Sequence, residues 1–229
     1  MRLLRVIMVA ASFAALLAKP SAAQDDRPFH DAWFMGVRGG LLNYSTESDA
    51  AGPANGTANA IAPLVGLDWV ITRNRAGVYV GLDQSFFSSG AYYRRPAVAG
   101  DPTAELRNLR RISLAAMLFP MQRPMTHPYL GFGLALNQIG SAELNAIIPI
   151  PALASAARDS LQSKRVAISP MIIAGIQQRL PGFSVFAQGS GSWLQNGFLL
   201  KNLDSKNYLQ WTLEGGIRYN IGSSIDRQP

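Results

Sequence analysis

Hydrophobic and polar residues alternate along most of the chain from residue 33 onward, with the period of β-strands that have two different faces. The last such segment shows the pattern most clearly, because Trp211, Leu213 and Ile217 fall on one face. Glu214 and Arg218 fall on the opposite face of the same segment. Eight segments are predicted as strands on this basis. They are Trp33–Tyr44, Ala60–Thr72, Gly77–Ser88, Leu106–Phe119, Tyr129–Gly140, Lys164–Arg179, Phe183–Gln195 and Tyr208–Gly222.

The connections between the predicted strands are alternately short and long. The short ones are Arg73–Ala76, Pro120–Pro128 and Leu180–Gly182, and the long ones are Ser45–Asn59, Ser89–Glu105, Ser141–Ser163 and Asn196–Asn207. An up-and-down transmembrane barrel with both termini in the periplasm must have this order. An immunoglobulin-type sandwich follows no such rule, because its long crossovers fall irregularly. The sequence therefore predicts an all-β fold, an eight-stranded antiparallel up-and-down transmembrane barrel.

Alternation does not say which face is outside, because a soluble lipocalin-like carrier has the same period with the opposite sense. One predicted face is uniformly large and apolar, whereas the other combines glycine and serine with a few ions. The interior of an eight-stranded barrel is just wide enough to be filled by side chains. We therefore place the apolar face against lipid. Trp33, Trp69, Tyr129 and Tyr219 fall near the predicted periplasmic ends and are expected to form an interfacial girdle.

Two segments depart from this simple pattern. Pro170 lies within the sixth predicted strand, and proline cannot donate a ladder hydrogen bond in a closed barrel. We expect either a bulge or a break of the strand there. The preceding connection contains a helix-compatible stretch, Ala152–Ser163, which is predicted to form a short helix over the barrel mouth.

The N-terminus has the properties of a cleavable export signal. Basic residues precede an apolar stretch, Val6–Ala18, which is too short to cross a bilayer as a helix. Small residues at positions 21–23 complete the cleavage pattern. We expect residues 1–23 to be a signal peptide and residues 24–229 to be one outer-membrane barrel domain. Loss of the three basic residues in that signal would lower the formal net charge from +7 to +4.

The composition agrees with an exported barrel. The chain has no cysteine, which excludes a disulfide-stapled scaffold. It is 48% hydrophobic and only 15% charged, yet no later apolar stretch is long enough for a transmembrane helix. Its arginines cluster around one long connection instead of forming a basic helix. Nucleic acid is therefore not an expected partner.

The segment Glu214-Gly215-Gly216-Ile217-Arg218-Tyr219-Asn220-Ile221 resembles the terminal β-signal of small outer-membrane barrels of the OmpA/OmpX kind. The resemblance covers essentially Trp33 to Gly222, and the signal positions are Glu214, Gly216, Tyr219 and Ile221. It implies assembly by the barrel-assembly machinery. We expect a monomeric barrel in the outer membrane. In many members the final aromatic residue ends the chain, whereas here Gly222–Pro229 follow.

Six ionic residues are expected on the polar, inward face near the middle of their strands. They are Arg38, Asp68, Asp83, Arg111, Glu214 and Arg218. Antiparallel closure brings the first strand beside the second and the eighth, so Arg38 could reach Asp68 or Glu214. Unpaired buried charges are costly, so opposite signs should meet locally. We expect a static salt-bridge network that fills the lumen, with a gated ion path or proton relay as the alternative.

Candidates for catalysis are few. An outer-leaflet lipid-modifying enzyme would need a serine within hydrogen-bond reach of a histidine. His30 and His127 are both expected on the periplasmic rim, the wrong side for that chemistry. No metal site and no cofactor are expected, because no histidine or carboxylate cluster has ligand spacing.

Arginines near the opposite rim suggest a contact with lipopolysaccharide phosphates. They are Arg94, Arg95, Arg107 and Arg110. We therefore expect an outer-membrane protein with a structural or surface-interaction role. A narrow porin-like channel, a lipid-modifying enzyme and a lipocalin-like carrier are the alternatives.

Overall fold

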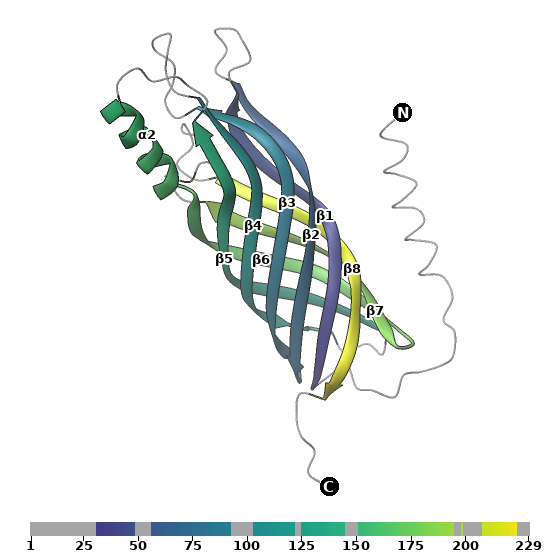
Figure 1. Cartoon of the computed structure of the whole chain (residues 1–229). Coiled ribbons are helices and arrows are strands. Elements are labelled where there is room, and N and C mark those ends of the chain that lie inside the picture. Colours follow the sequence, from purple (N-terminus) through teal and green to yellow (C-terminus); the bar gives the residue numbers. More distant parts are fainter. Residues whose placement is uncertain are drawn as a thin grey trace, which may run out of the picture.

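The computed structural model describes residues 31–48, 56–92, 103–121, 125–144, 151–194, 198 and 208–223. Eight antiparallel strands close into one barrel, in which every strand pairs with its neighbours in the chain and β8 pairs with β1 (Figure 1). The strands are β1 (Ala32–Ser48), β2 (Gly56–Arg73), β3 (Ala76–Tyr92), β4 (Thr103–Leu118), β5 (Thr126–Leu144), β6 (Val166–Leu180), β7 (Phe183–Leu194) and β8 (Tyr208–Ser223). The predicted fold class is confirmed.

The strands lie where the alternation predicts them and differ from the prediction only at their ends. Each long connection exceeds the short ones beside it, as expected for an up-and-down barrel, although residues 119–125 between β4 and β5 equal in number residues 49–55 between β1 and β2. Tight turns need residues that accept a positive φ. Asn74 (φ 51°) fills this role between β2 and β3, and Gly182 (φ 79°) fills it between β6 and β7.

The sheet closes with a stagger that tilts the strands. A row of paired residues leaves β6 at Gln177, passes through β7, β8 and β1 to β5, and returns to β6 at Ala167. The return point is ten residues from the start. With about 3.3 Å per residue and a tilt of roughly 40°, one circuit of this row climbs about 25 Å. Residues of one row therefore lie at different depths in the barrel wall.

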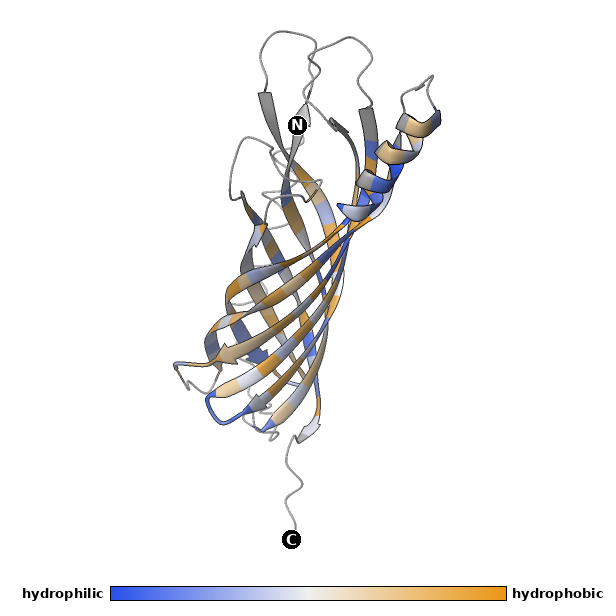
Figure 2. Cartoon of the chain, turned by 90° about the vertical axis from the view of Figure 1, so that its left-hand side faces the viewer, coloured by the Kyte–Doolittle hydropathy of each residue, from blue (hydrophilic) through white to orange (hydrophobic). Residues whose placement is uncertain are grey.

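The apolar face of the sheet is outside. Leu213 is 56% exposed and Phe132 is 64% exposed, while Arg38 and Glu214 are each only 5% exposed. Along each strand, hydrophobic and hydrophilic residues alternate accordingly (Figure 2). This is the sense of a lipid-facing barrel and the reverse of a lipocalin, which keeps its apolar face inside.

Three of the four predicted girdle residues, Trp33, Trp69 and Tyr219, lie on the outer surface or at its edge near the short connections. The two tryptophan rings pack together, with centroids 5.1 Å apart. The prediction for Tyr129 is wrong. It is 1% exposed and points into the lumen, because it shares the alternating face of buried Ala135 and not that of exposed Phe132.

Pro170 neither breaks nor bulges β6, so that prediction is also wrong. The register with β5 continues without a shift through the pair Leu134 and Pro170. Pairing with β7 begins only at the next residue, Met171, which lies opposite Ser192. Within the described residues, Pro170 is therefore the last residue of the segment at the start of β6 that pairs with β5 alone, where the missing N–H is tolerated.

The predicted helix is present as α2 (Pro151–Ser163) but does not cover the mouth. It lies beside the upper end of β5 and points away from the barrel (Figures 1 and 2). Leu161 is its one buried residue among those whose side chains are described. No helix in the described part of the chain is long and apolar enough to span a bilayer. The predicted signal peptide, residues 1–23, lies outside the described residues.

Candidate functional site

The six ionic residues predicted to face inward converge in the middle of the lumen, and we call them the ionic layer. They come from five strands: Arg38 from β1, Asp68 from β2, Asp83 from β3, Arg111 from β4, and Glu214 and Arg218 from β8. None is more than 5% exposed. The layer contains three cations and three anions, so its formal charges balance.

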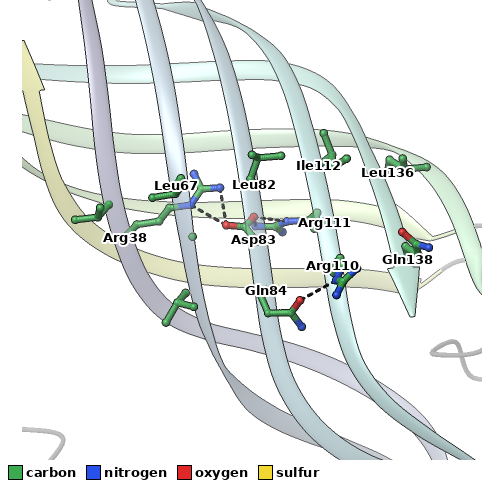
Figure 3. A pocket seen from close by; sticks show the side chains of 13 residues that line it. Arg38, Leu67, Leu82, Asp83, Gln84, Arg110, Arg111, Ile112, Leu136 and Gln138 are labelled. Carbon is green, nitrogen blue, oxygen red and sulfur yellow. Dashed lines mark hydrogen bonds and ion pairs between the residues drawn. The ribbon is translucent and has the colours of Figure 1, made fainter. Parts of the chain in front are cut away.

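Four members of the ionic layer form a closed ring of ion pairs. Arg38 Nη2 lies 2.6 Å from Asp83 Oδ1, and Arg38 Nε lies 3.2 Å from Glu214 Oε2. Arg111 Nη2 completes the ring, 2.9 Å from Asp83 Oδ2 and 2.7 Å from Glu214 Oε1. Each carboxylate thus bridges two guanidinium groups. Figure 3 shows Asp83 between Arg38 and Arg111.

The remaining pair, Arg218 and Asp68, lies beside the ring on the side of the short connections. Arg218 donates Nη2 to Asp68 Oδ2 at 2.8 Å and Nε to the same oxygen at 3.1 Å. Arg38 Nη1 is 3.7 Å from Asp68 Oδ2, which is an electrostatic contact and not a hydrogen bond. The guanidinium of Arg218 also lies 3.7 Å from the centre of the Phe186 ring, a cation–π distance.

Neutral side chains link the ions into one network. Gln188 donates Nε2 to Glu214 Oε2 at 2.8 Å and accepts from the Tyr129 hydroxyl at 2.9 Å. Arg218 donates to Gln177 Oε1 at 2.8 Å, and Arg111 donates to Ser190 Oγ at 3.1 Å. Hydrogen bonds of this kind offset part of the cost of removing charges from water.

Two apolar clusters occupy the lumen above and below the charges. The cluster toward the short connections is Ala32, Phe34, Val70, Tyr79, Ala115, Met117, Phe119, Tyr129, Ala135, Met171 and Ile173. The cluster toward the long connections is Leu42, Tyr44, Ala62, Leu64, Leu106, Leu109, Ile139, Ala142, Leu194 and Phe198. Leu42, Leu106 and Ile139 are 0% exposed, so no water-sized space adjoins them. Apolar side chains therefore pack in the lumen on both sides of the ionic layer.

Sequence reasoning named the six ions but missed their neutral partners. Gln177, Gln188 and Ser190 lie on the same faces as the small polar residues of β6 and β7, so the alternation could have indicated them. Tyr129 was missed because it was assigned to the outer girdle. Within the described residues, no cluster of three or more histidine and carboxylate side chains has the geometry of a metal site.

The predicted lipopolysaccharide contacts divide into two groups. Arg107 and Arg110 are exposed on the outer surface of β4, whereas Arg94 and Arg95 lie outside the described residues. Arg107 donates Nε to Glu105 Oε1 at 2.8 Å.

A β-bulge separates Arg107 from Arg110: Phe86 and Phe87 of β3 lie opposite the single residue Asn108, whose φ is 60°. The sequence analysis did not predict this bulge.

Two further predictions concern the ends of strands. His127 lies within β5 and not in a turn, and it is 2% exposed. His30 lies outside the described residues.

Of the predicted β-signal, Glu214 and Gly216 face the lumen, while Tyr219 and Ile221 face outward. A partner protein could reach all four residues while β8 is unpaired. After the barrel has closed, it could reach only Tyr219 and Ile221.

No model of a known protein family matches the chain, and no curated protein matches it in sequence. Its fold matches the crystal structure of Neisserial surface protein A (NspA) with a TM-score of 0.50 and 15% identity, covering 82% of this chain and 96% of that one. The outer membrane protein OprG from Pseudomonas aeruginosa matches with a TM-score of 0.50 and 13% identity, covering 86% and 100%. The predicted resemblance is confirmed at the level of the fold: the chain has the architecture of small eight-stranded outer-membrane β-barrels.

Proposed function

We propose that the chain is an integral protein of a Gram-negative-type outer membrane whose barrel does not conduct. In this proposal the barrel is a rigid support, and its role is structural or lies in interactions at the membrane surface. The outward apolar face and the shared fold support the membrane location. The proposal assigns no catalytic reaction and no cofactor to the barrel.

The observation that carries this proposal is the filled lumen. A passing ion would have to separate Arg38 and Arg111 from Asp83 and Glu214, which lie 2.6–3.2 Å apart. Separation of charges in a buried site is costly, since the local dielectric is low. The apolar clusters add further barriers, because an ion that passes them would lose hydration without gaining a polar partner. A narrow channel is therefore the less favoured function.

The proposal extends to topology and assembly. Both ends of the barrel chain, Ala32 and Ser223, lie at the end of the barrel with the short connections (Figure 1). We propose that this end is periplasmic and that residues 1–23 direct export. We further propose that the β-signal in β8 is recognised by the barrel-assembly machinery and that the barrel is monomeric.

Membrane fractionation and planar-bilayer recording test these proposals separately. The protein should enter the outer-membrane fraction and migrate faster on a gel when it is not boiled. Purified protein should then give no steady conductance, and neither should Glu214→Gln, because both apolar clusters remain. A steady conductance of the wild type that changes in Glu214→Gln would establish an ion path through the ionic layer instead.

A further inference from the structure

A hollow lies on the lipid-facing side of the barrel wall, across five neighbouring strands, and we call it the outer hollow. Its volume is about 670 Å³. Two outward rows of cross-strand neighbours line it (Figure 3). The first row is Val65, Gln84, Arg110 and Gln138, and the second is Val37, Leu67, Leu82, Ile112 and Leu136. Arg38, Asp83 and Arg111, whose side chains are buried on the lumen side, also line the hollow, so its floor is the barrel wall itself.

The depth of the outer hollow follows from the stagger of the sheet. Its rows run from β1 to β5 and climb with the tilt of the barrel. At about 3.3 Å per residue and a tilt of roughly 40°, Arg110 lies about 20 Å above the level of Gln177. Trp193, near the upper end of β7, lies at about the same height by the same geometry. Trp and Tyr mark the membrane–water interface of such barrels, so Arg110 lies at headgroup level on the side of the long connections.

The opposite end of the outer hollow lies deeper in the hydrocarbon layer. By the same geometry, Val37, at the β1 end of the hollow, lies more than about 10 Å lower than Arg110 along the barrel axis. The hollow spans four strand spacings, or about 19 Å. Val37, Leu67 and Leu82 are 48–59% exposed and apolar. The shape is therefore an oblique apolar groove with its polar end uppermost.

Arg110 has no carboxylate partner in the part of the chain that the structure describes. Among the described residues its one hydrogen bond is donated by Nε to Gln84 Oε1 at 3.1 Å, which leaves both Nη groups free to donate. Arg107 on the same strand is different, because Glu105 already neutralises it. An arginine on a lipid-facing wall attracts an anion, and phosphate accepts its paired N–H groups well. Gln84 and Gln138 flank the guanidinium and add further polar atoms.

We propose that the outer hollow is a binding site for one lipid A molecule of the outer leaflet, with a phosphate on Arg110 and an acyl chain along the apolar groove. This inference rests on the proposed outer-membrane location. It assigns the phosphate contact to Arg110 and not to Arg107. The position of the cation at the upper end favours a lipid of the outer leaflet, and the groove requires an acyl chain next to the phosphate.

Native mass spectrometry of the detergent-solubilised, folded barrel tests the site. The barrel is titrated with bisphosphorylated lipid A, phosphatidylglycerol or phosphatidylethanolamine. We expect one lipid A molecule to bind more tightly than either phospholipid. Arg110→Gln should weaken lipid A binding about tenfold, equivalent to about 1.4 kcal/mol. Arg107→Gln, which removes the same charge from the same strand, should change it less than twofold.

A second pair of variants tests the groove. Leu82→Trp fills the hollow and should weaken lipid A binding, whereas Leu130→Trp, also outward but outside the hollow, should not. Equal effects of Arg110→Gln and Arg107→Gln would overturn the site, and phosphatidylglycerol binding as tightly as lipid A would overturn the assigned lipid. A wild type that fails the gel shift and membrane fractionation would refute the proposed function itself. A wild type that passes both but binds no lipid A would refute only this inference.

Discussion

Gly66 shows how closely the ionic layer approaches the barrel wall. It lies between Arg38 on β1 and Asp83 on β3 in one row of paired residues. A methyl group at this position would overlap Asp83 Oδ1 and the carbonyl oxygen of Leu82, and it would lie 3.0 Å from Arg38 Nε. The absence of a side chain at Gly66 is therefore what lets the guanidinium and carboxylate groups meet against the backbone.

Gly66→Ala should destabilise the barrel by about 2 kcal/mol, the usual cost of forcing an extra carbon into a packed site. Gly39→Ala is the matched control, because a methyl group there meets nothing nearer than the Leu64 carbonyl oxygen at 3.7 Å. Urea unfolding in lipid vesicles gives both free energies. If the two variants unfold at the same urea concentration, the close packing around Arg38 and Asp83 is not important for stability.

Removal of one charge tests the balance of the ionic layer. Glu214→Gln leaves Arg38 and Arg111 with an uncompensated buried charge, and we expect a loss of about 3 kcal/mol in the free energy of unfolding. Glu105→Gln makes the same chemical change in the exposed pair with Arg107 and should cost much less, because solvent screens that pair. The same urea titration compares the two. Similar losses would show that burial adds little to the pairing of Glu214.

At the scale of residues, the sequence was sufficient to find the charges but not their arrangement. The period-two pattern placed all six ions on the inner face. It could not show that Arg38 contacts three carboxylates, because that depends on the stagger of the closed barrel. Nor could it show that Arg107 has a carboxylate partner and Arg110 has none among the described residues, since the bulge at Asn108 changes which residues face outward.

At the scale of elements, β6 shows what a single proline demands of its neighbours. Pro170 pairs with β5 and has no β7 partner in the described residues, whereas Ile172 pairs with both Phe132 of β5 and Gly191 of β7. A proline at a doubly paired position must remove a ladder hydrogen bond. β6 therefore continues through Pro170 because its pairing with β7 begins only at Met171.

This placement makes a prediction about assembly. Pro170→Ala should leave the yield of folded barrel unchanged, whereas Ile172→Pro should lower it severalfold, because a hydrogen bond between paired strands is lost. Ile172→Ala controls for the loss of the outward side chain. The folded fraction is read from the fast-migrating band of unboiled samples. Normal folding of Ile172→Pro would show that β6 does not need its continuous ladder.

The strands were predictable because their period is local and repeated, and the long and short connections fixed their order. The features that were missed depend on contacts distant in sequence. Tyr129 donates a hydrogen bond to Gln188 of β7 inside the lumen, and α2 lies beside the barrel because its contacts are with β5. The alternation sets the face of a residue, whereas the closure of the barrel sets which side chains meet inside it, and a single sequence does not contain that information.

At the scale of the whole molecule, the barrel reverses the usual distribution of side chains. Charged and polar groups are packed in the centre, while leucine, isoleucine and valine cover the outer wall. This arrangement is stable only when lipid replaces water around the wall, since an apolar surface of this extent is costly in water. The barrel is thus stable only with lipid around it. The fluorescence of the four tryptophans can measure whether the outer wall contacts lipid.

Trp33 and Trp69 lie near the short connections, and Trp193 and Trp211 lie near the opposite end of the barrel. In vesicles of brominated lipids, bromine near the headgroup end of the acyl chain should quench tryptophan fluorescence more than bromine at the bilayer centre, because all four lie toward the two interfaces. Iodide in the water should quench weakly. Substitution of Trp33 and Trp69 by Phe should leave the pattern unchanged, since the upper pair lies at an equivalent depth. Strong quenching by iodide and none by bromine would mean that the apolar wall does not contact lipid, and with it the assignment of the ionic layer to a lumen within the bilayer would fail.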